Sequence, residues 1–241
     1  MRRLSIEALV EHFPDFRVAF VLAEPLTIGP RSAALAEDIA AAESECRARW
    51  GGMELSAIPG VAAWRAAYKG FGIKRTSYRS SVERLIKRVL AGQPLPEINA
   101  LVDLYNMASL TSVLCLGCDD LDKTDGDLVF RFSRPDDSFV DMGAEAGEDP
   151  NDPPKEGEVV YADARHVLCR RWNWRQDARS ALSAETRRAV LTVQSNGFRD
   201  VDAASTLLAR LIARECGADS RIEVLDGGRP TATVEAAARR R

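Results

Sequence analysis

The spacing of apolar residues predicts helices along much of the chain. Residues 95–110, LPEINALVDLYNMASL, carry Leu101, Leu104, Tyr105 and Ala108 at three- and four-residue steps, the period of a helix with one apolar face. Prolines and a glycine just before this run indicate a turn. The same period predicts further helices over residues 32–50, 59–71, 80–91 and 202–215.

Alternating or β-branched runs predict the strands. Residues 127–132, DLVFRF, place leucine and phenylalanine at every second position, as on a strand with one buried face. Further strands are expected over residues 16–22, 158–163, 166–171, 186–194 and 221–225. Residues 133–156 are rich in Asp, Glu, Gly and Pro, so we expect a long loop there. The pattern predicts an α+β fold, one domain over residues 1–241, with helices first and strands after.

The predicted helix at residues 95–110 also carries a polar face. Asn99, Asp103 and Asn106 recur at steps of four and three residues, so they share one side of the helix, and Ser109 follows on the same run. A carboxamide and carboxylate stripe beside an apolar stripe indicates a candidate pocket wall. A solvated helix face with caps is the alternative that these residues leave open.

Composition and charge restrict the class of protein. The 241 residues are 46% hydrophobic and 29% charged, which is typical of a globular chain. Apolar runs all fall short of the roughly 20 residues that a membrane span needs, and residues 1–16 lack an apolar signal core, so we expect a cytoplasmic protein without a membrane partner. The net charge of −3 argues against a general nucleic-acid coat, and we expect no DNA partner, but it leaves room for a local basic patch.

Candidate metal ligands and nucleophiles are few. Cys115 and Cys118 have the C-x-x-C spacing of a metal site, but a second pair or suitably spaced histidines are missing, so we interpret them as small buried thiols. His12 and His166 are the only histidines available to a nucleophile system. Phosphate-loop and dinucleotide glycine motifs are absent, so no metal and no cofactor is expected.

Two stretches combine arginine with aromatic residues. Residues 71–81, FGIKRTSYRSS, bring Arg79 and other basic residues to a predicted helix start, which suits a phosphate or carboxylate. Residues 169–179, CRRWNWRQDAR, interleave Arg170 and Arg175 with Trp172, the chemistry that holds nucleic-acid backbone and bases. Arginine stems packed on aromatic surface and paired with carboxylates are the alternative for both.

Six stretches in order resemble the B3/B4 domain family, the tRNA-editing domain first defined in the beta subunit of phenylalanyl-tRNA synthetase. They are W-x3-Y-x2-FG at residues 64–72, SYRSS-V-x-x-L-x-x-R at 77–88, LP-x-IN-x-LVDLYN-x-x-S at 95–109, GDL at 126–128, GEVVYAD at 157–163 and CRRWNWRQ at 169–176. The resemblance covers roughly residues 56–195. It implies a β-sandwich-like core with packed helices, in a free-standing member of the family.

The resemblance implies editing in trans, that is, hydrolysis of a mischarged aminoacyl-tRNA without tRNA charging. In the expected mechanism water attacks the aminoacyl ester. Glu158 or Asp163 orients the water, and Asn106 holds the developing oxyanion. Asn99, Asp103 and Ser109 line the pocket, and the tRNA end is held by Arg79, Arg170, Arg175 and Trp172.

Two other classes remain open from sequence. The first alternative to editing is a non-catalytic module that binds tRNA or an amino-acid-like ligand. The second is an enzyme that acts on a free amino-acid derivative. Neither the edited amino acid nor the tRNA follows from the sequence, because one methylene in a pocket changes discrimination by only about 1–3 kcal/mol.

Overall fold

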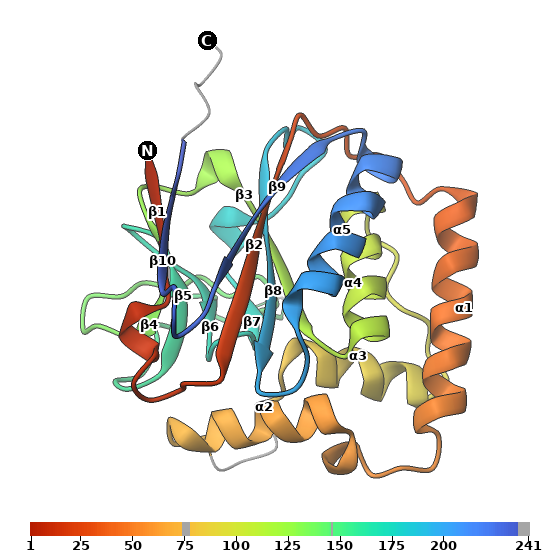
Figure 1. Cartoon of the computed structure of the whole chain (residues 1–241), viewed down its shortest axis with the longest axis horizontal. Coiled ribbons are helices and arrows are strands. Elements are labelled where there is room, and N and C mark those ends of the chain that lie inside the picture. Colours follow the sequence, from red (N-terminus) through yellow and green to blue (C-terminus); the bar gives the residue numbers. More distant parts are fainter. Residues whose placement is uncertain (74–77, 146, 236–241) are drawn as a thin grey trace.

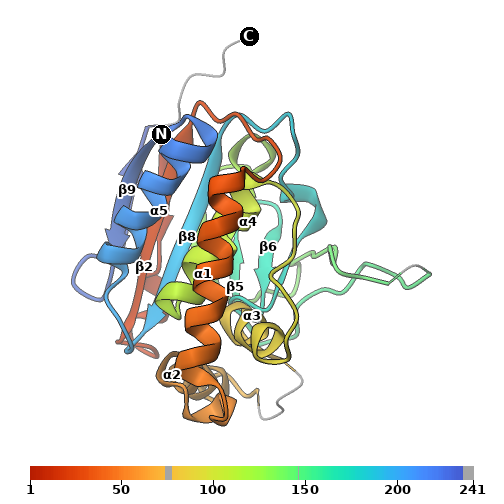
Figure 2. The same ribbon diagram turned by 90° about the vertical axis from the view of Figure 1, so that its right-hand side faces the viewer.

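Two β-sheets pack face to face, and helices cover the outer face of one of them (Figure 1). The computed structural model describes residues 1–73, 78–145 and 147–235. The helices are α1 (Ala33–Trp50), α2 (Pro59–Gly70), α3 (Ser81–Leu90), α4 (Ala100–Ser112) and α5 (Val201–Cys216). Helices α4 and α5 pack side by side, and α1 packs on α4 (Figure 2). None of the helices in the described part combines the length and apolarity that crossing a bilayer requires.

The strands form one sheet of six and one of four. The six-stranded sheet has the order β10 (Thr231–Val234), β1 (Arg2–Ser5), β4 (Leu128–Phe132), β5 (Val159–Ala162), β6 (Val167–Arg170), β7 (Arg175–Gln176). The four-stranded sheet has the order β3 (Cys115–Asp120), β8 (Ala189–Asn196), β2 (Phe16–Glu24), β9 (Asp219–Leu225). The β1 and β4 strands are parallel, and the other pairs are antiparallel. The expected α+β architecture with a sandwich-like core is confirmed.

Aromatic side chains hold the two sheets together. Phe16 and Phe20 of β2 reach Phe130 of β4, with ring centroids 5.2 and 6.1 Å apart. Phe130 stacks on Tyr161 of β5 at 4.6 Å. Strand β2 lies between this layer and the helices, so it is buried on both faces and has a continuous apolar sequence.

Trp172 lies in the same core, although it belongs to the turn between β6 and β7. Its side chain is fully buried and meets the rings of Phe13, Phe16 and Trp64 at 4.7, 4.9 and 5.3 Å. Large aromatic side chains supply much of the energy of a core. Trp172 therefore anchors the β6–β7 turn to the rest of the molecule.

The helix starts follow their capping residues. Ser32, Ser80 and Asn99 each accept a hydrogen bond from a backbone N–H in the first turn, at 3.0, 3.4 and 3.0 Å. The carboxylate of Glu83, three residues after Ser80, binds Arg65 at 2.6 Å.

Several elements differ from the sequence prediction. Helix α4 begins at Ala100, because Asn99 caps it. Strands β1, β3 and β10 were not predicted, and β1 and β2 precede the helices, so the expected order of helices first and strands after was wrong. Residues 133–145 and 147–156 protrude from the body as a long excursion, as expected, and an isolated bridge joins Val140 and Asn151 (Figure 2).

We predict that Trp172→Ala lowers the free energy of unfolding by about 3–5 kcal/mol, because it empties a well-packed site in the core. Urea unfolding measures the loss. Trp174→Ala is the matched control, since Trp174 is only partly buried and should cost less than half as much. Equal losses for the two variants would contradict the assignment of Trp172 as the anchor.

Candidate active site

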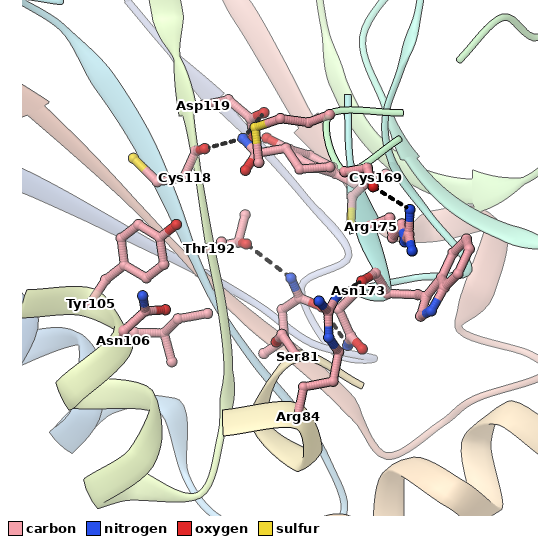
Figure 3. Close-up of a pocket in the computed structure, with 18 of the residues that line it drawn as sticks. Ser81, Arg84, Tyr105, Asn106, Cys118, Asp119, Cys169, Asn173, Arg175 and Thr192 are labelled. Atoms are coloured by element: carbon pink, nitrogen blue, oxygen red, sulfur yellow. Dashed lines mark hydrogen bonds between the residues drawn. The ribbon is translucent and has the colours of Figure 1, made fainter. Parts of the chain in front are cut away.

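A cavity of about 250 Å³ opens where the free edges of the two sheets meet. Strand β3 ends the four-stranded sheet and β7 ends the six-stranded sheet. Helices α3 and α4 and residues 141–143 of the excursion complete the walls (Figure 3). The polar, aromatic and thiol side chains that line the cavity include Arg84, Tyr105, Asn106, Cys118, Asp119, Asp141, Tyr161, Cys169, Asn173, Trp174, Arg175, Gln176, Thr192 and Gln194.

Gly117 leaves space in the wall made by β3. A Cβ atom built there would meet only the Thr192 hydroxyl oxygen, at 3.6 Å, which is an ordinary contact. A longer side chain at position 117 would extend into the cavity beside Thr192. The hollow therefore depends on a glycine in the middle of an otherwise regular strand.

The β6–β7 turn supplies one whole side of the cavity. Arg171 and Trp172 have φ values of +46° and +67°, a left-handed conformation that is costly for residues with a side chain. The turn buries Trp172 in the core and presents Asn173, Trp174 and Arg175 to the cavity. The arrangement of these three residues thus follows from a strained turn that the core holds in place.

A chain of hydrogen bonds orients the amide groups on this side. The Tyr68 hydroxyl donates to Asn173 Oδ1 at 2.9 Å, and Asn173 Nδ2 donates to Gln194 Oε1 at 3.2 Å. Gln194 Nε2 then donates to Thr192 Oγ1 at 2.9 Å. Because the Thr192 hydroxyl oxygen accepts the hydrogen bond from Gln194, its hydrogen is left to donate into the cavity.

Asp119 is the buried acid of the cavity, with 4% of its surface exposed. Its Oδ1 atom accepts from Ser180 Oγ at 2.6 Å and from Gln176 Nε2 at 3.0 Å. Burial raises the pKa of Asp119 to about 7, although these two hydrogen bonds act to lower it. Within the described residues Asp119 has no ion-pair partner, so its charge is uncompensated when it ionises.

The cavity wall holds no activated protein nucleophile. Burial raises the pKa of the Cys118 and Cys169 thiols, which disfavours the reactive thiolate. No histidine lines the cavity: His12 packs on Phe132, and His166 lies 4.0 Å from Asp163 in a turn. Neither a thiolate nor an imidazole is therefore available in the cavity as the attacking group.

The rim combines an indole with two arginines. Trp174 is partly exposed, and the Arg175 guanidinium lies over its ring at 4.8 Å. Arg175 pairs with Asp141 of the excursion, and its Nη1 atom also donates to the Gly143 carbonyl at 3.1 Å. Arg84 of α3 donates to the Trp174 carbonyl at 3.2 Å. Cationic and aromatic groups therefore surround the opening.

Of the residues proposed from sequence, the structure brings Asn106 and Arg175 to this cavity. The Asn106 amide faces it from α4 and makes no hydrogen bond with the described residues (Figure 3). The other polar residues near α4 hold the structure itself. Asn99 caps the helix, Asp103 is buried against Arg31 at 2.9 Å, and Ser109 donates to the Leu114 carbonyl at 2.6 Å.

Glu158 and Asp163 do not line the cavity. Glu158 is buried in ion pairs with Arg170 at 2.8 Å and Arg171 at 3.1 Å. Asp163 accepts from the backbone N–H groups of Asp125, Arg165 and His166, as a turn-forming carboxylate does. Both acids already have a full set of partners, so neither is placed to orient a water molecule in the cavity.

The remaining predicted tRNA ligands also lie away from the cavity or inside the core. Arg170 is fully buried between Glu158 and Asp152. Arg79 pairs with Glu83 at 3.3 Å, and Trp172 has no exposed face for a base. The neighbouring basic residues 74 and 75 of the expected phosphate site lie outside the described residues.

The C-x-x-C spacing does not make a metal site here. Residues three apart on a regular strand point to opposite faces, so Cys115 and Cys118 cannot bind the same ion. The described residues contain no group of three or more His, Cys, Asp or Glu side chains arranged to hold a metal.

Sequence reasoning missed Asp119, Thr192 and Gln194. All three lie on strands of one sheet, where only the fold shows which residues face the gap between the sheets. The motif CRRWNWRQ was a usable signal, since five of its residues line the cavity: Cys169, Asn173, Trp174, Arg175 and Gln176.

We predict that Asp119 makes folding less favourable as the pH rises. The folded chain keeps a proton on Asp119 up to a pKa of about 7, whereas the ordinary value is 3.8, so the folded state binds more protons between these values. The variant Asp119→Asn keeps an oxygen that can accept from Ser180 and Gln176 but does not ionise.

Urea unfolding at several pH values measures the effect. For each pH unit between 5 and 7, the unsubstituted chain should lose about 1.4 kcal/mol of unfolding free energy through Asp119. From pH 5 to pH 8, the stability of Asp119→Asn relative to the unsubstituted chain should therefore increase by roughly 3 kcal/mol. A parallel pH dependence of the two proteins would show that Asp119 titrates normally.

Comparison with known proteins identifies the family. No curated protein matches the chain. A similar solved structure is the N-terminal fragment of the phenylalanyl-tRNA synthetase beta subunit from Pyrococcus horikoshii, with 11% sequence identity and a TM-score of 0.48. The match covers 90% of the present chain and 50% of the synthetase fragment, so the present chain spans about half the length of that fragment. The family model of the B3/4 domain matches residues 63–212, which is more than half of the chain. The chain therefore belongs to the B3/4 domain family.

Proposed function

We propose that the chain, acting as one B3/4 unit, hydrolyses the ester of a mischarged aminoacyl-tRNA. The observation that carries the proposal is the cavity between β3 and β7, which combines polar groups that lack partners with an aromatic and cationic rim. Membership of the B3/4 family supports it, because the sequence resembles an editing domain in six stretches.

The size of the cavity suits one amino-acid residue. Its volume of about 250 Å³ lies just below the roughly 300–1,000 Å³ of sites that hold drug-sized molecules. Tyr105, Cys118 and Cys169 give it an apolar part for a side chain, and Asp119 and Thr192 give it a polar part. A whole nucleotide would have to remain at the rim.

The chemistry proposed for the cavity is attack by water on a positioned ester. The Asn106 amide and the Thr192 hydroxyl are free to donate hydrogen bonds to the oxyanion that forms on the ester carbonyl. An aminoacyl ester is already labile, and holding it beside water supplies much of the remaining acceleration. Glu158 and Asp163 have no part in this proposal, because both are held in other contacts.

The rim is the proposed site for the end of the tRNA. Trp174, and not the buried Trp172, is the proposed contact for the terminal adenine, because it is partly exposed. Arg171 and Arg175 already lie over its ring at 4.4 and 4.8 Å, so the adenine would meet the part of the indole that they leave open. Arg84 and Arg175 lie beside it for the phosphates. The chain has a net charge of −3, so attraction of RNA has to come from such a local group of cations.

A second candidate is a module that binds the same ligand without hydrolysing it. The raised thiol pKa values and the lack of histidine in the cavity wall are equally consistent with this candidate. A third, hydrolysis of a free amino-acid ester, would use the cavity but not the rim. A deacylation screen of correctly and incorrectly charged tRNAs, with free esters included, separates the three.

We predict that the chain releases the amino acid from one class of mismatched tRNA, and that Asn106→Ala lowers this turnover about 100-fold, the typical cost of losing one oxyanion donor. Asn196→Ala is the matched control, because Asn196 is also partly buried but lies at the end of β8 outside the cavity. Equal rates for both folded variants would remove Asn106 from the mechanism.

The affinity for tRNA should depend only weakly on salt, with a slope of log affinity against log salt of roughly 2–3, because few phosphates meet cations at the rim. Arg175→Ala should reduce this slope by nearly one, with a smaller effect on the rate at saturation. Arg229→Ala, an exposed arginine in the β9–β10 connection, should leave the slope unchanged. A slope steeper than about 6 would place the tRNA on another surface.

A further inference from the structure

Asp119 lacks the partner that a buried carboxylate normally has. Charged side chains inside proteins are paired or neutralised, because burying a lone charge is costly. Both hydrogen bonds to Asp119 end on Oδ1, and within the described part of the chain Oδ2 accepts none. One carboxylate oxygen is therefore left over in the cavity wall.

Tyr161 leaves a second polar atom without a partner in the same cavity. Its side chain is 2% exposed, and the hydroxyl makes no hydrogen bond with the described residues. The ring is fixed by stacking on Phe130 at 4.6 Å. Asp119 and Tyr161 both line the cavity, and the charge of Asp119 adds to burial in raising the pKa of Tyr161.

Within the described residues, no ion pair supplies Asp119 with a cation. Its hydrogen-bond partners Gln176 and Ser180 are neutral, and the other groups with an electrostatic effect on it or from it are neutral or acidic: Tyr105, Cys118, Tyr161, Asp163, Cys169 and Asp177. Arg2 acts on Tyr161 from β1, where it donates to Thr124 Oγ1 at 2.7 Å. At the rim, Arg84 binds the Trp174 carbonyl and Arg175 is paired with Asp141.

An ammonium group complements this arrangement. It has three N–H donors and no acceptor, while an ionised carboxylate only accepts and a tyrosine oxygen is able to accept. Its charge also compensates Asp119. A neutral hydroxyl would leave the buried charge unpaired, and an anion would be repelled.

We propose that Asp119 and Tyr161 form a subsite for a primary ammonium group on the ligand. The inference rests on the proposed function, and it defines the substrate as an aminoacyl ester with a free ammonium group. Acylation of that nitrogen removes the charge and adds bulk, so N-blocked ligands are rejected. The ammonium belongs to either the α-position or a side chain, and the experiment below distinguishes these sources.

Binding should release a proton. At pH 6.5 Asp119 is largely protonated in the free protein, because its pKa is about 7. An arriving ammonium favours the carboxylate, so the proton leaves to the buffer. Calorimetry in buffers of different ionisation enthalpy counts this proton without any measurement of enzymatic activity.

The test uses three hydrolysis-resistant probes: leucinamide, N-acetyl-leucinamide and Nα-acetyl-lysinamide. We expect leucinamide to bind at least tenfold more tightly than N-acetyl-leucinamide, with release of about three-quarters of a proton at pH 6.5. Preferred binding of Nα-acetyl-lysinamide would also support the subsite and would assign the ammonium to a side chain. No binding of either ammonium probe at millimolar concentration, or equal binding of N-acetyl-leucinamide, would overturn the proposal.

Substitutions connect the effect to the two residues. Asp119→Asn should lower the affinity for the ammonium probe at least tenfold and abolish proton release. Tyr161→Phe should lower this affinity several-fold while proton release is retained. Asp122→Asn, the same chemical change on the exposed turn after β3, is the control and should change neither quantity. Thermal melting confirms that each variant is folded.

The outcome for the subsite is separate from that for the proposed function. Unchanged binding in Asp119→Asn overturns the subsite, whether or not the protein deacylates tRNA. Intact ammonium binding in a protein that deacylates no tRNA in the screen overturns hydrolysis and leaves the subsite in place.

Discussion

The insertion of Trp172 between the two sheets is the contact on which the candidate site depends. The indole belongs to a short turn whose backbone is strained at Arg171 and Trp172, and the rings of Phe13, Phe16 and Trp64 hold it in place. With Trp172 fixed, the residues that follow it, Asn173 to Gln176, are directed at the cavity. The energy of the aromatic core thus offsets the strain of a turn that positions polar groups.

Internal pairing of charge explains why the cavity rim is the proposed RNA surface. Arg170 binds Glu158 and Asp152 in the interior, Arg131 binds Asp137 at 2.6 Å, and Arg179 binds Asp177 at 2.6 Å. Arginines engaged in this way stabilise loops and strand ends and have little charge left for phosphate. Arg84 differs because its hydrogen-bond partner in the described residues is a neutral carbonyl, that of Trp174. Arg175 does pair with Asp141, but like Arg84 it lies at the cavity opening beside an indole.

The sequence was most informative where local chemistry decides the structure. Helix periodicity and the apolar run of β2 both predicted elements that the structure contains. Strand β3 was missed because CLGCDD is buried along most of its length and has neither alternation nor β-branched residues. The roles of polar residues were harder still to predict. Asp103 is buried and paired with an arginine, whereas Asn106 is open to a cavity. The two residues look alike in sequence, because the groups around them come from distant segments.

The cavity as the ligand site is the central claim, and Gly117→Val tests it most directly. A β-branched side chain suits the strand, and its methyl groups would occupy the hollow beside Thr192 without removing any proposed binding group. Gly29→Val makes the same change where a Cβ meets nothing within 4 Å. The measurement is the affinity for a non-hydrolysable 3′-aminoacylamino-adenosine. Binding should be lost in folded Gly117→Val and retained in Gly29→Val, and unchanged affinity in Gly117→Val would show that the ligand binds elsewhere.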